Sequence, residues 1–343
     1  MRTNALLLTA PREISVQEID LREIEQEEIL VNVKACGVCG TDLHMYHGDK
    51  GAFENSFPLV MGHEFSGVVS AVGNKVSRLK VGDHVAIDPN VYCGTCSPCL
   101  RGDVHFCENM IGIGTTEFGG FSEHCIVPEK AAYKVPEDLP FEYAAMVEPL
   151  SCCLHGIDRS GIKPGATVMI VGFGAIGQMM LQLSFIAGAA KVVVLETMAA
   201  KREKALEMGA FLSLDSASSD LKNNLEEAGI THISSIIECV GKKETMELAL
   251  DLSTPLTTVM LFGLTPPETV MNILPYEQLF AKEITLTASY INPLVADRVI
   301  GLLVSGRIDL SNIITDRIPL RDSTTVFTDS AYRQRGKILI GDF

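Results

Sequence analysis

The sequence has 343 residues and is acidic, with 28 Lys and Arg, 43 Asp and Glu, and a formal net charge of −15. This length exceeds what one hydrophobic core usually organises, so two domains are expected. The negative charge argues against nucleic acid and anionic membranes as partners, because both require a basic face. No apolar run approaches the roughly 20 residues that span a bilayer, and the N-terminus lacks the core and cleavage site of a signal peptide. A cytoplasmic protein is therefore expected, in which ten cysteines favour metal binding or catalysis over disulfides.

The first section, up to about residue 150, contains short β-type runs separated by glycine and proline, such as EILVNVKACGV and FSGVVSAVG. This section holds Cys39, His63 and Glu64, which offer sulfur, nitrogen and oxygen ligands, a set that suits Zn²⁺. His63 and Glu64 are adjacent, so both can bind one ion only where the backbone bends, and Gly62 makes room for that bend. Glu148, in AAMVEPLSCC, is expected at the same centre, either as a fourth ligand or holding a metal-bound water.

Four cysteines follow the pattern C-x2-C-x2-C-x7-C in a lobe at about residues 90–110: Cys93, Cys96, Cys99 and Cys107. A redox CxxC would lie beside a βαβ unit, and this one lies in the β-rich half. In ferredoxin-type runs the next cysteine comes three residues on and precedes proline, which is not the case here. Four thiolates close a tetrahedral zinc site with no open position. The pattern predicts a structural zinc that contributes folding energy to the lobe.

From residue 151 onward, β-branched runs such as ATVMIVGFG, AKVVVLE and ISSIIECVG alternate with helical patterns such as AIGQMMLQLSFIAGA. Repeated strand–helix units predict a doubly wound parallel sheet over 151–289. Residues 290–343 contain one more helical segment and a short β run, KILIGDF, that is expected to return to the first section. The predicted fold class is α/β plus β: a β-rich domain of residues 1–150 and 290–343, interrupted by the α/β domain.

The stretch VMIVGFGAIG places Gly172, Gly174 and Gly177 after an apolar strand and at the start of a helix. A bare GxGxxG is weak evidence, but this context strengthens it. Gly172 permits the tight turn, Gly174 lets the backbone approach a pyrophosphate, and Gly177 allows close helix–strand packing. The N-terminus of the helix then presents free N–H groups to the phosphates.

The next strand ends at Glu196, where an acidic residue is expected to hold the adenosine ribose hydroxyls. A carboxylate there also repels a 2′-phosphate, so NAD is favoured over NADP. Lys201 and Arg202 keep the NADP alternative open, although a solvated helix face is the better interpretation of these two residues.

The run Gly62-His63-Glu64, followed by Gly67, Gly73 and Val76, resembles the zinc signature of the medium-chain alcohol/polyol dehydrogenases. CGVCGTDLH, EPLSCCLHG and GFGAIG stand where that family has its other landmarks, so the resemblance covers essentially the whole chain. It implies a GroES-like catalytic domain interrupted by a Rossmann domain, two zinc ions per chain, NAD as cofactor, and a small-molecule alcohol as substrate. It also implies a homo-oligomer, with a tetramer favoured over a dimer.

The same resemblance implies roles for further residues. Thr41 resembles the hydroxyl that accepts the alcohol proton, and His44 resembles the histidine that completes the relay, a task to which histidine side chains are suited in general. Cys152 stands where the family often has a threonine facing the nicotinamide. The remaining candidate cofactor contacts are Ala175, Ile176, Lys201, Val240, Gly263, Leu264 and Ser289.

The sequence indicates the class of substrate less specifically than it indicates the cofactor. Glu64 and the EPL run resemble the sorbitol, butanediol and threonine dehydrogenase branches. Sorbitol enzymes often carry an arginine at the position of Ser289 and a tyrosine at that of Met45, and both are missing here. We therefore expect hydride transfer to NAD from a secondary alcohol of a small polyol or diol, giving the ketone.

Three other functions remain as alternatives to a polyol or diol dehydrogenase. An L-threonine 3-dehydrogenase needs an anion site for the amino-acid carboxylate. A sugar-phosphate polyol dehydrogenase needs a cationic group in the cleft, and the sequence reveals none. A non-enzymatic descendant is disfavoured, because loss of a ligand would be its expected mark, and Cys39, His63, Glu64, Thr41 and His44 are all present.

Overall fold

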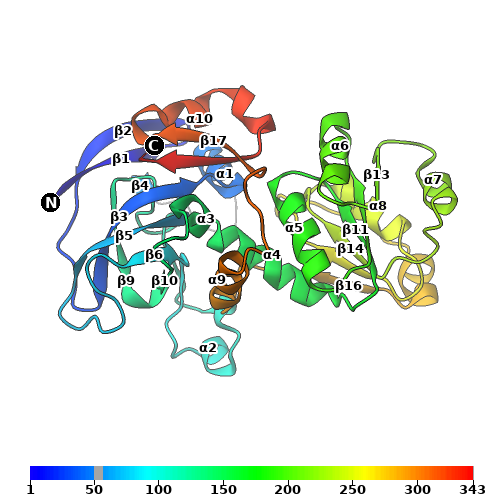
Figure 1. Cartoon of the computed structure of the whole chain (residues 1–343), viewed down its shortest axis with the longest axis horizontal. Helices are drawn as coiled ribbons and strands as arrows, with labels where there is room; N and C mark the ends of the chain where they lie inside the picture. Colours follow the sequence, from blue (N-terminus) through cyan, green and yellow to red (C-terminus); the bar gives the residue numbers. More distant parts are fainter. Residues whose placement is uncertain (50–56, 343) are drawn as a thin grey trace. The chain divides into compact units, whose positions relative to one another are not determined.

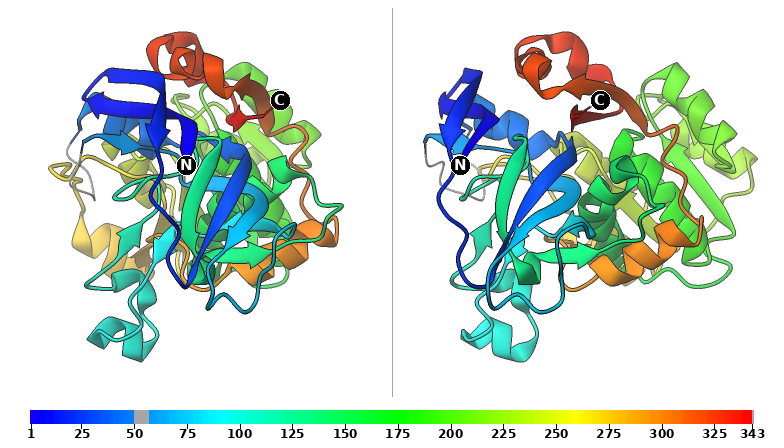
Figure 2. Two further views of the ribbon diagram at one scale, coloured as in Figure 1. Left: turned by 90° about the vertical axis from the view of Figure 1, so that its left-hand side faces the viewer. Right: turned by 60° about the vertical axis from the view of Figure 1, so that its left-hand side comes forward.

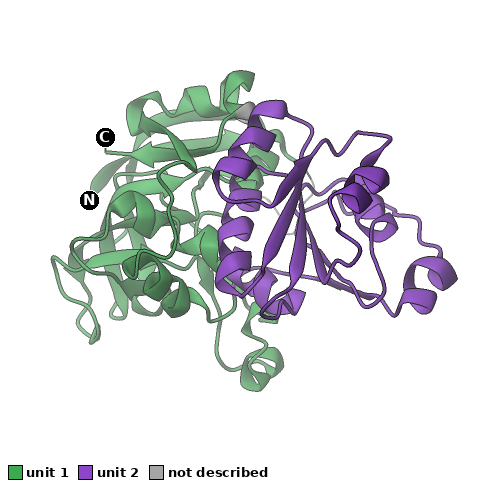
Figure 3. Ribbon diagram, turned by 45° about the vertical axis from the view of Figure 1, so that its right-hand side comes forward, with its two compact units in different colours: residues 1–151, 293–343 green, residues 152–292 purple. Residues whose placement is uncertain are grey.

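The computed structural model describes residues 1–49 and 57–342. The chain divides into two compact units, Met1–Ser151 with Pro293–Phe343, and Cys152–Asn292, which are coloured separately in Figure 3. The first unit is thus built from both ends of the chain, and the second is one continuous insertion. Helix α4 (Val147–Ser160) runs through the junction in the sequence.

The main sheet of the first unit has the order β10-β6-β5-β3-β18-β17, and β9 also pairs with β3. Its strands are β3 (Glu28–Gly37), β5 (Glu64–Val72), β6 (His84–Ile87), β9 (His124–Pro128), β10 (Ala132–Lys134), β17 (Ile314–Pro319) and β18 (Lys337–Gly341). In β3 the residues alternate between buried and half-buried, as expected for a strand with one face on the core. This strand is the centre of the sheet, because β5, β9 and β18 all pair with it.

The C-terminal strand β18 lies antiparallel to β3, with Leu339 opposite Gly37 and Gly341 opposite Ala35. Figures 1 and 2 show this red strand in the same unit as the blue N-terminal strands. The pairing brings Lys337, the first residue of β18, to the segment that follows β3. Phe343, the last residue of the predicted C-terminal strand, lies outside the described residues.

The other elements of this unit are smaller. A three-stranded sheet has the order β2-β1-β4, and β7 pairs with β8. The strands are β1 (Arg2–Ala10), β2 (Glu13–Asp20), β4 (Leu59–Val60), β7 (Asn90–Val91) and β8 (Ile111–Gly112). The helices are α1 (Gly40–His47), α2 (Ser97–Arg101), α3 (Phe141–Ala145), α9 (Ala296–Val304) and α10 (Thr324–Thr328). Short helical turns are η1 (Val104–Phe106), η2 (Glu129–Ala131), η5 (Leu320–Asp322) and η6 (Ser330–Gln334).

The second unit is built on a six-stranded parallel sheet of order β13-β12-β11-β14-β15-β16. Its strands are β11 (Thr167–Val171), β12 (Lys191–Leu195), β13 (Leu212–Leu214), β14 (Ser235–Glu238), β15 (Thr258–Leu261) and β16 (Thr285–Ala288). Its helices are α5 (Ala175–Ile186), α6 (Ala199–Glu207), α7 (Leu221–Glu227) and α8 (Lys243–Asp251), with turns η3 (Pro275–Leu279) and η4 (Phe280–Lys282). The predicted doubly wound parallel sheet is confirmed.

The register aligns the carboxyl ends of the central strands. Val171 of β11 pairs with Leu195 of β12 and with Glu238 of β14, which in turn pairs with Leu261 of β15. The strand order reverses between β11 and β14. In open parallel sheets, ligands bind outside the carboxyl ends of the strands at such a reversal. The loops after β11, β14 and β15 are therefore the parts of this unit where a ligand is expected.

Over the described ranges 1–49 and 57–342, none of the helices combines the length and apolarity that a bilayer crossing requires.

Candidate metal centres and dinucleotide site

The structure brings Cys39, His63 and Glu64 together. One ligand atom from each lies within 4.8 Å of the others, and both His63 and Glu64 are buried. Cys39 is the N-cap of α1, while His63 and Glu64 lead into β5. Gly62 has φ +91°, and a Cβ there would lie 2.7 Å from Cys36 Sγ and from the Phe121 ring. The bend that lets neighbouring residues share one centre therefore requires glycine.

Asp42 orients His63, a role that the sequence alone did not indicate. Its buried carboxylate places Oδ1 3.4 Å from His63 Nδ1, and Oδ2 accepts a 2.8 Å hydrogen bond from the Cys39 N–H. This arrangement leaves Nε2 of His63 for a metal ion and fixes the ring relative to Cys39. The available signal was positional: Asp42 is the third residue of α1, where an acidic side chain commonly accepts the N-cap amide.

Lys337 is a second residue that sequence reasoning missed. Its buried ammonium forms an ion pair with Glu64 Oε2 and donates a 3.0 Å hydrogen bond to the Val38 carbonyl. Burial alone would lower the pKa of Lys337, but the negative charges of Glu64, Cys39 and Glu148 raise it, so the side chain is a cation. No local pattern marks this residue, because it comes from the opposite end of the chain.

The donor set and its charge fit Zn²⁺. Sulfur, nitrogen and oxygen atoms converge in a buried place, as in tetrahedral sites with three protein ligands. A divalent cation together with the Lys337 ammonium would balance the negative charges of Cys39, Glu64 and Glu148.

Glu148 stands apart from that group. It is buried in the first turn of α4, and among the described residues the close group of ligand atoms consists of Cys39, His63 and Glu64 without it. Its charge nevertheless acts on the pKa of Lys337. Its participation at the centre stays a prediction.

Thr41 and His44 both lie on α1, three residues apart and hence on one side of the helix. Thr41 Oγ1 lies 3.7 Å from Cys39 Sγ. His44 is exposed, and its Nδ1 lies 2.9 Å from Asp49 Oδ2. The structure thus sets a hydroxyl near the Cys39 sulfur and an exposed histidine on the same side of the helix, and a proton relay through them stays a prediction.

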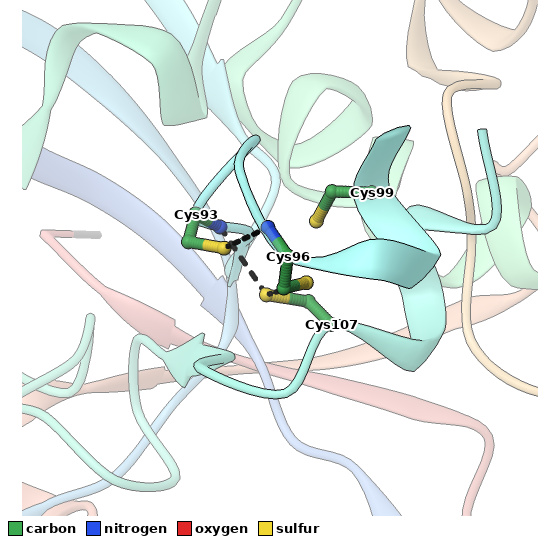
Figure 4. Close-up of side chains that lie close together, drawn as sticks. All are labelled: Cys93, Cys96, Cys99 and Cys107. Carbon is green, nitrogen blue, oxygen red and sulfur yellow. Dashed lines mark hydrogen bonds between the residues drawn. The ribbon is translucent and has the colours of Figure 1, made fainter. Parts of the chain in front are cut away.

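The four cysteines of the lobe also converge, with one Sγ from each within 4.8 Å of the others (Figure 4). Cys96 is the N-cap of α2, Cys99 lies within α2, and Cys107 follows η1. The Cys107 sulfur accepts N–H groups from Cys93 at 3.2 Å and Asn109 at 3.4 Å. Such a closed group of sulfurs, with backbone amides directed at them, fits a structural zinc ion.

The thiol pKa values in this lobe diverge. The Thr95 hydroxyl, with backbone N–H groups of Thr95 and Cys96, lowers the pKa of Cys93 to about 5. Desolvation and the neighbouring thiols Cys96, Cys107 and Cys93 raise the pKa of Cys99 to about 12. A bound cation would lower the pKa of Cys99 and so favour its thiolate form.

The glycine-rich turn occupies the predicted place between β11 and α5. Gly172 has φ +92°, and a Cβ there would lie 2.5 Å from Val240 Cγ2. A Cβ on Gly177 would lie 2.2 Å from the Gly172 carbonyl oxygen, whereas one on Gly174 meets nothing within 4 Å. Gly174 is the N-cap of α5, followed by Ala175 and Ile176 in its first turn. The open side at Gly174 is where an approaching phosphate would find free N–H groups.

Glu196 follows β12 and ties two loops together. Its carboxylate accepts N–H groups from Phe173 at 2.9 Å and Met198 at 3.0 Å. Burial alone would raise the pKa of Glu196, but these donors and the charge of Lys201 lower it, so it is an anion. Arg202 Nη1 donates to the carbonyls of Glu196 at 2.9 Å and Thr197 at 2.6 Å.

The other residues expected to contact the cofactor lie at the carboxyl ends of neighbouring strands. Val240 follows β14, Gly263 and Leu264 follow β15, and Ser289 follows β16. Val240 and Leu264 are exposed. Their positions agree with the loops where a ligand of this sheet is expected, and their contacts with a cofactor stay predictions.

Two family models match the chain: an alcohol dehydrogenase GroES-like domain over residues 25–137 and a zinc-binding dehydrogenase over residues 175–303. L-threonine 3-dehydrogenase of Bacillus subtilis is 31% identical over 94% of this chain and 93% of its own length. The chain belongs to the zinc-binding dehydrogenases. The predicted fold class, a GroES-like domain with a Rossmann domain, is confirmed, as is the resemblance to the medium-chain polyol dehydrogenases.

Other zinc-binding dehydrogenases are similarly related. D-arabinitol dehydrogenase 1 of Uromyces fabae is 30% identical over 98% of this chain and 96% of its own. The crystal structure of a zinc-binding dehydrogenase from Sinorhizobium meliloti, bound to NADP, matches with a TM-score of 0.95 at 35% identity and covers 100% of both chains. The 343-residue chain, as a member of this family, is therefore an oxidoreductase.

Replacement of Lys337 by methionine should strongly destabilise the metal-free protein, because it leaves the buried Glu64 carboxylate without its ammonium. Breaking a buried pair from one side typically costs about 3–5 kcal/mol. Urea unfolding of chelator-treated protein measures the change. The control is Lys34→Met, which removes an exposed ion pair to Asp342 in the same sheet and should cost less than about 1 kcal/mol. Equal effects of the two substitutions would contradict this role of Lys337.

Zinc affinity at the Cys39 centre should increase with pH. Burial alone would lower the pKa of His63, but Asp42 and Cys39 raise it well above its ordinary value, so a proton competes with the metal. Affinity should rise up to about tenfold per pH unit until the imidazole has lost this proton. Chelator competition on the wild type and on Cys39→Ser separates this centre from the lobe. An affinity that does not change from about pH 6 to pH 9 would contradict this competition.

Proposed function

We propose that this zinc-binding dehydrogenase transfers hydride from a secondary alcohol of a small polyol or diol to NAD, giving the ketone. The observation that carries the proposal is the convergence of half-buried Cys39 with buried His63 and Glu64. In a catalytic zinc site three protein ligands leave a position open for substrate oxygen. Lewis acidity of zinc lowers the pKa of an alcohol, and the nicotinamide accepts the hydride.

The chain's own residues would do the rest. Cys39, His63 and Glu64 would hold the ion, while Asp42 keeps His63 Nδ1 occupied so that Nε2 faces it. Thr41, 3.7 Å from the Cys39 sulfur, would accept the alcohol proton. His44 is exposed and would pass that proton to solvent. Glu148 would add negative charge or a water ligand from the first turn of α4.

NAD is proposed over NADP on the geometry of the loop after β12. The Glu196 carboxylate is anionic and would bind ribose hydroxyls and repel a 2′-phosphate. The Arg202 Nη1 donates to two carbonyls and lies 3.7 Å from Asp215 Oδ2, contacts that hold the guanidinium against this loop. The Sinorhizobium meliloti relative binds NADP, so both cofactors belong in the test.

The second zinc ion is proposed to be structural, held by the four cysteines of the lobe. The chain would then carry two zinc ions with separate tasks. The family resemblance further supports a homo-oligomer, a tetramer rather than a dimer, acting in the cytoplasm. Its partners would be the alcohol and the cofactor, with no nucleic acid.

Cys39→Ser and Cys99→Ser should separate the two tasks. Each should lower the zinc content from two ions per chain towards one, because each removes a thiolate ligand. Cys39→Ser should reduce kcat by at least about 100-fold with the melting temperature little changed. Cys99→Ser should instead lower the melting temperature or weaken the oligomer, while protein that stays folded keeps its turnover. The reverse pattern would show that the lobe carries the chemistry.

A substrate panel tests the function itself. The panel contains small polyols, diols, a sugar-phosphate polyol and L-threonine, each with NAD and with NADP, and reduced-nicotinamide absorbance is the readout. The expected result is the highest kcat/KM with a polyol or diol and NAD. Threonine is the main rival, because relatives acting on a polyol and on threonine are almost equally identical to this chain. A clear preference for threonine would replace the proposed substrate, and no turnover with any member would remove the proposed function.

A further inference from the structure

We propose that Glu238 is a positioning residue for the dinucleotide: it holds the turn that places Val240 against Gly172 at the carboxyl end of the sheet. This inference rests on the proposed dinucleotide binding and adds to it a residue that touches neither the cofactor nor the metal. Glu238 is the last residue of β14 and is fully buried. It stands at the strand-order reversal where ligands of such sheets bind.

The carboxylate of Glu238 is surrounded by donors from its own turn. Oε1 accepts the N–H of Val240 at 2.8 Å, the N–H of Gly241 at 3.0 Å and the hydroxyl of Thr245 at 2.8 Å. Oε2 also accepts the Gly241 N–H, at 3.2 Å. Hydrogen bonds to an ionised acceptor are the strong ones, so the conformation of the turn depends on this side chain.

The loop after β15 is tied to the same residue. The main-chain oxygen of Glu238 accepts N–H groups from Phe262 at 2.9 Å and Gly263 at 3.0 Å. Gly241 has φ +76°, and a Cβ there would lie 2.3 Å from the Leu264 carbonyl oxygen. The turn after β14 and the loop after β15 are therefore packed backbone to backbone, with Glu238 beneath both.

The turn also reaches the glycine-rich loop. A Cβ on Gly172 would lie 2.5 Å from Val240 Cγ2, so the Val240 side chain fills the space that glycine leaves open. Val240 is itself 40% exposed, which leaves part of it free to contact a ligand. Glu238 thus fixes the amide of a residue that has one side against the phosphate-binding turn and the other side free.

A buried carboxylate is costly to maintain. Burial raises the pKa of Glu238, although the donors around it oppose that change. An apolar residue at the end of a parallel strand would avoid this cost, but the N–H groups of Val240 and Gly241 would lose this acceptor, whereas the Thr245 hydroxyl could still donate to the Lys242 carbonyl. Placement of a turn beside the cofactor is the function that explains why the charge is kept.

Glu238→Gln tests the inference in the zinc-loaded, full-length protein. An amide offers one oxygen and directs its NH₂ at a donor, so at least one N–H of the turn loses its partner. We expect the Kd for NADH and the KM for NAD to rise about tenfold, while kcat at saturating NAD stays within about twofold and zinc content is unchanged. NADH fluorescence gives the Kd, because a chain without tryptophan offers no indole fluorescence as a binding signal.

The matched control is Thr245→Val, which removes one donor to the same carboxylate and leaves both amide bonds. Its effect on Kd should stay below about threefold. If Glu238→Gln does not fold, Glu238→Asp carries the same test, because it keeps the charge but is shorter by one methylene. A Kd unchanged by the folded variant overturns the inference, as does a fall in kcat with no change in Kd or KM.

A double-mutant cycle that combines Glu238→Gln with Val240→Ala tests whether Glu238 acts through Val240. If Glu238 acts by placing Val240, the double variant should bind NADH about as weakly as the weaker single variant. Effects that multiply independently overturn the inference. A wild type that binds neither NADH nor NADPH overturns the proposed function together with this inference, whereas a wild type that binds and a variant that binds equally well overturn the inference alone.

Discussion

The ion pair between Lys337 and Glu64 is the interaction on which the architecture of the first unit depends. A buried ammonium and a buried carboxylate are each unfavourable alone and acceptable only together. Lys337 belongs to β18, near the end of the chain, and Glu64 begins β5, near its start. Because β18 pairs with β3, the C-terminal segment must return after the whole of the second unit has been inserted. The partner of the Glu64 carboxylate is therefore supplied by the C-terminal strand β18.

Other buried charges also have partners that offset the cost of burial, but these partners are closer in the sequence. Asp42 is satisfied by the Cys39 amide and the His63 ring, which are also the groups it must orient. In the second unit, Glu196 and Glu238 stand after β12 and at the end of β14, and both accept backbone N–H groups of loops beside the glycine-rich turn. At each of these places a buried carboxylate, which is unfavourable without partners, accepts hydrogen bonds that fix the conformation of a loop.

The two cysteine-containing centres differ in what their surroundings allow. The four sulfurs of the lobe lie within 4.8 Å of one another and accept backbone amides, so an ion bound to all four would have no exchangeable ligand. The Cys39 centre brings together three candidate ligands of different chemistry, with the Thr41 hydroxyl 3.7 Å from the Cys39 sulfur and exposed His44 on the same helix. The cluster that looks more reactive in the sequence is therefore the one whose geometry suits a structural task.

The sequence by itself determined the features that depend on local spacing and periodicity. The apolar runs predicted the parallel sheet, and three spaced glycines predicted the turn at Gly172. The spacing of cysteine, histidine and glutamate predicted the two groups of candidate metal ligands. Asp42, Lys337 and Glu238 were not found in this way, since isolated charged residues in a sequence look like solvated surface. Only the tertiary structure decided that these three are buried and what each one contacts. The physical reason is that the cost of burying a charge, and the partner that offsets it, exist only after strands distant in the chain have paired.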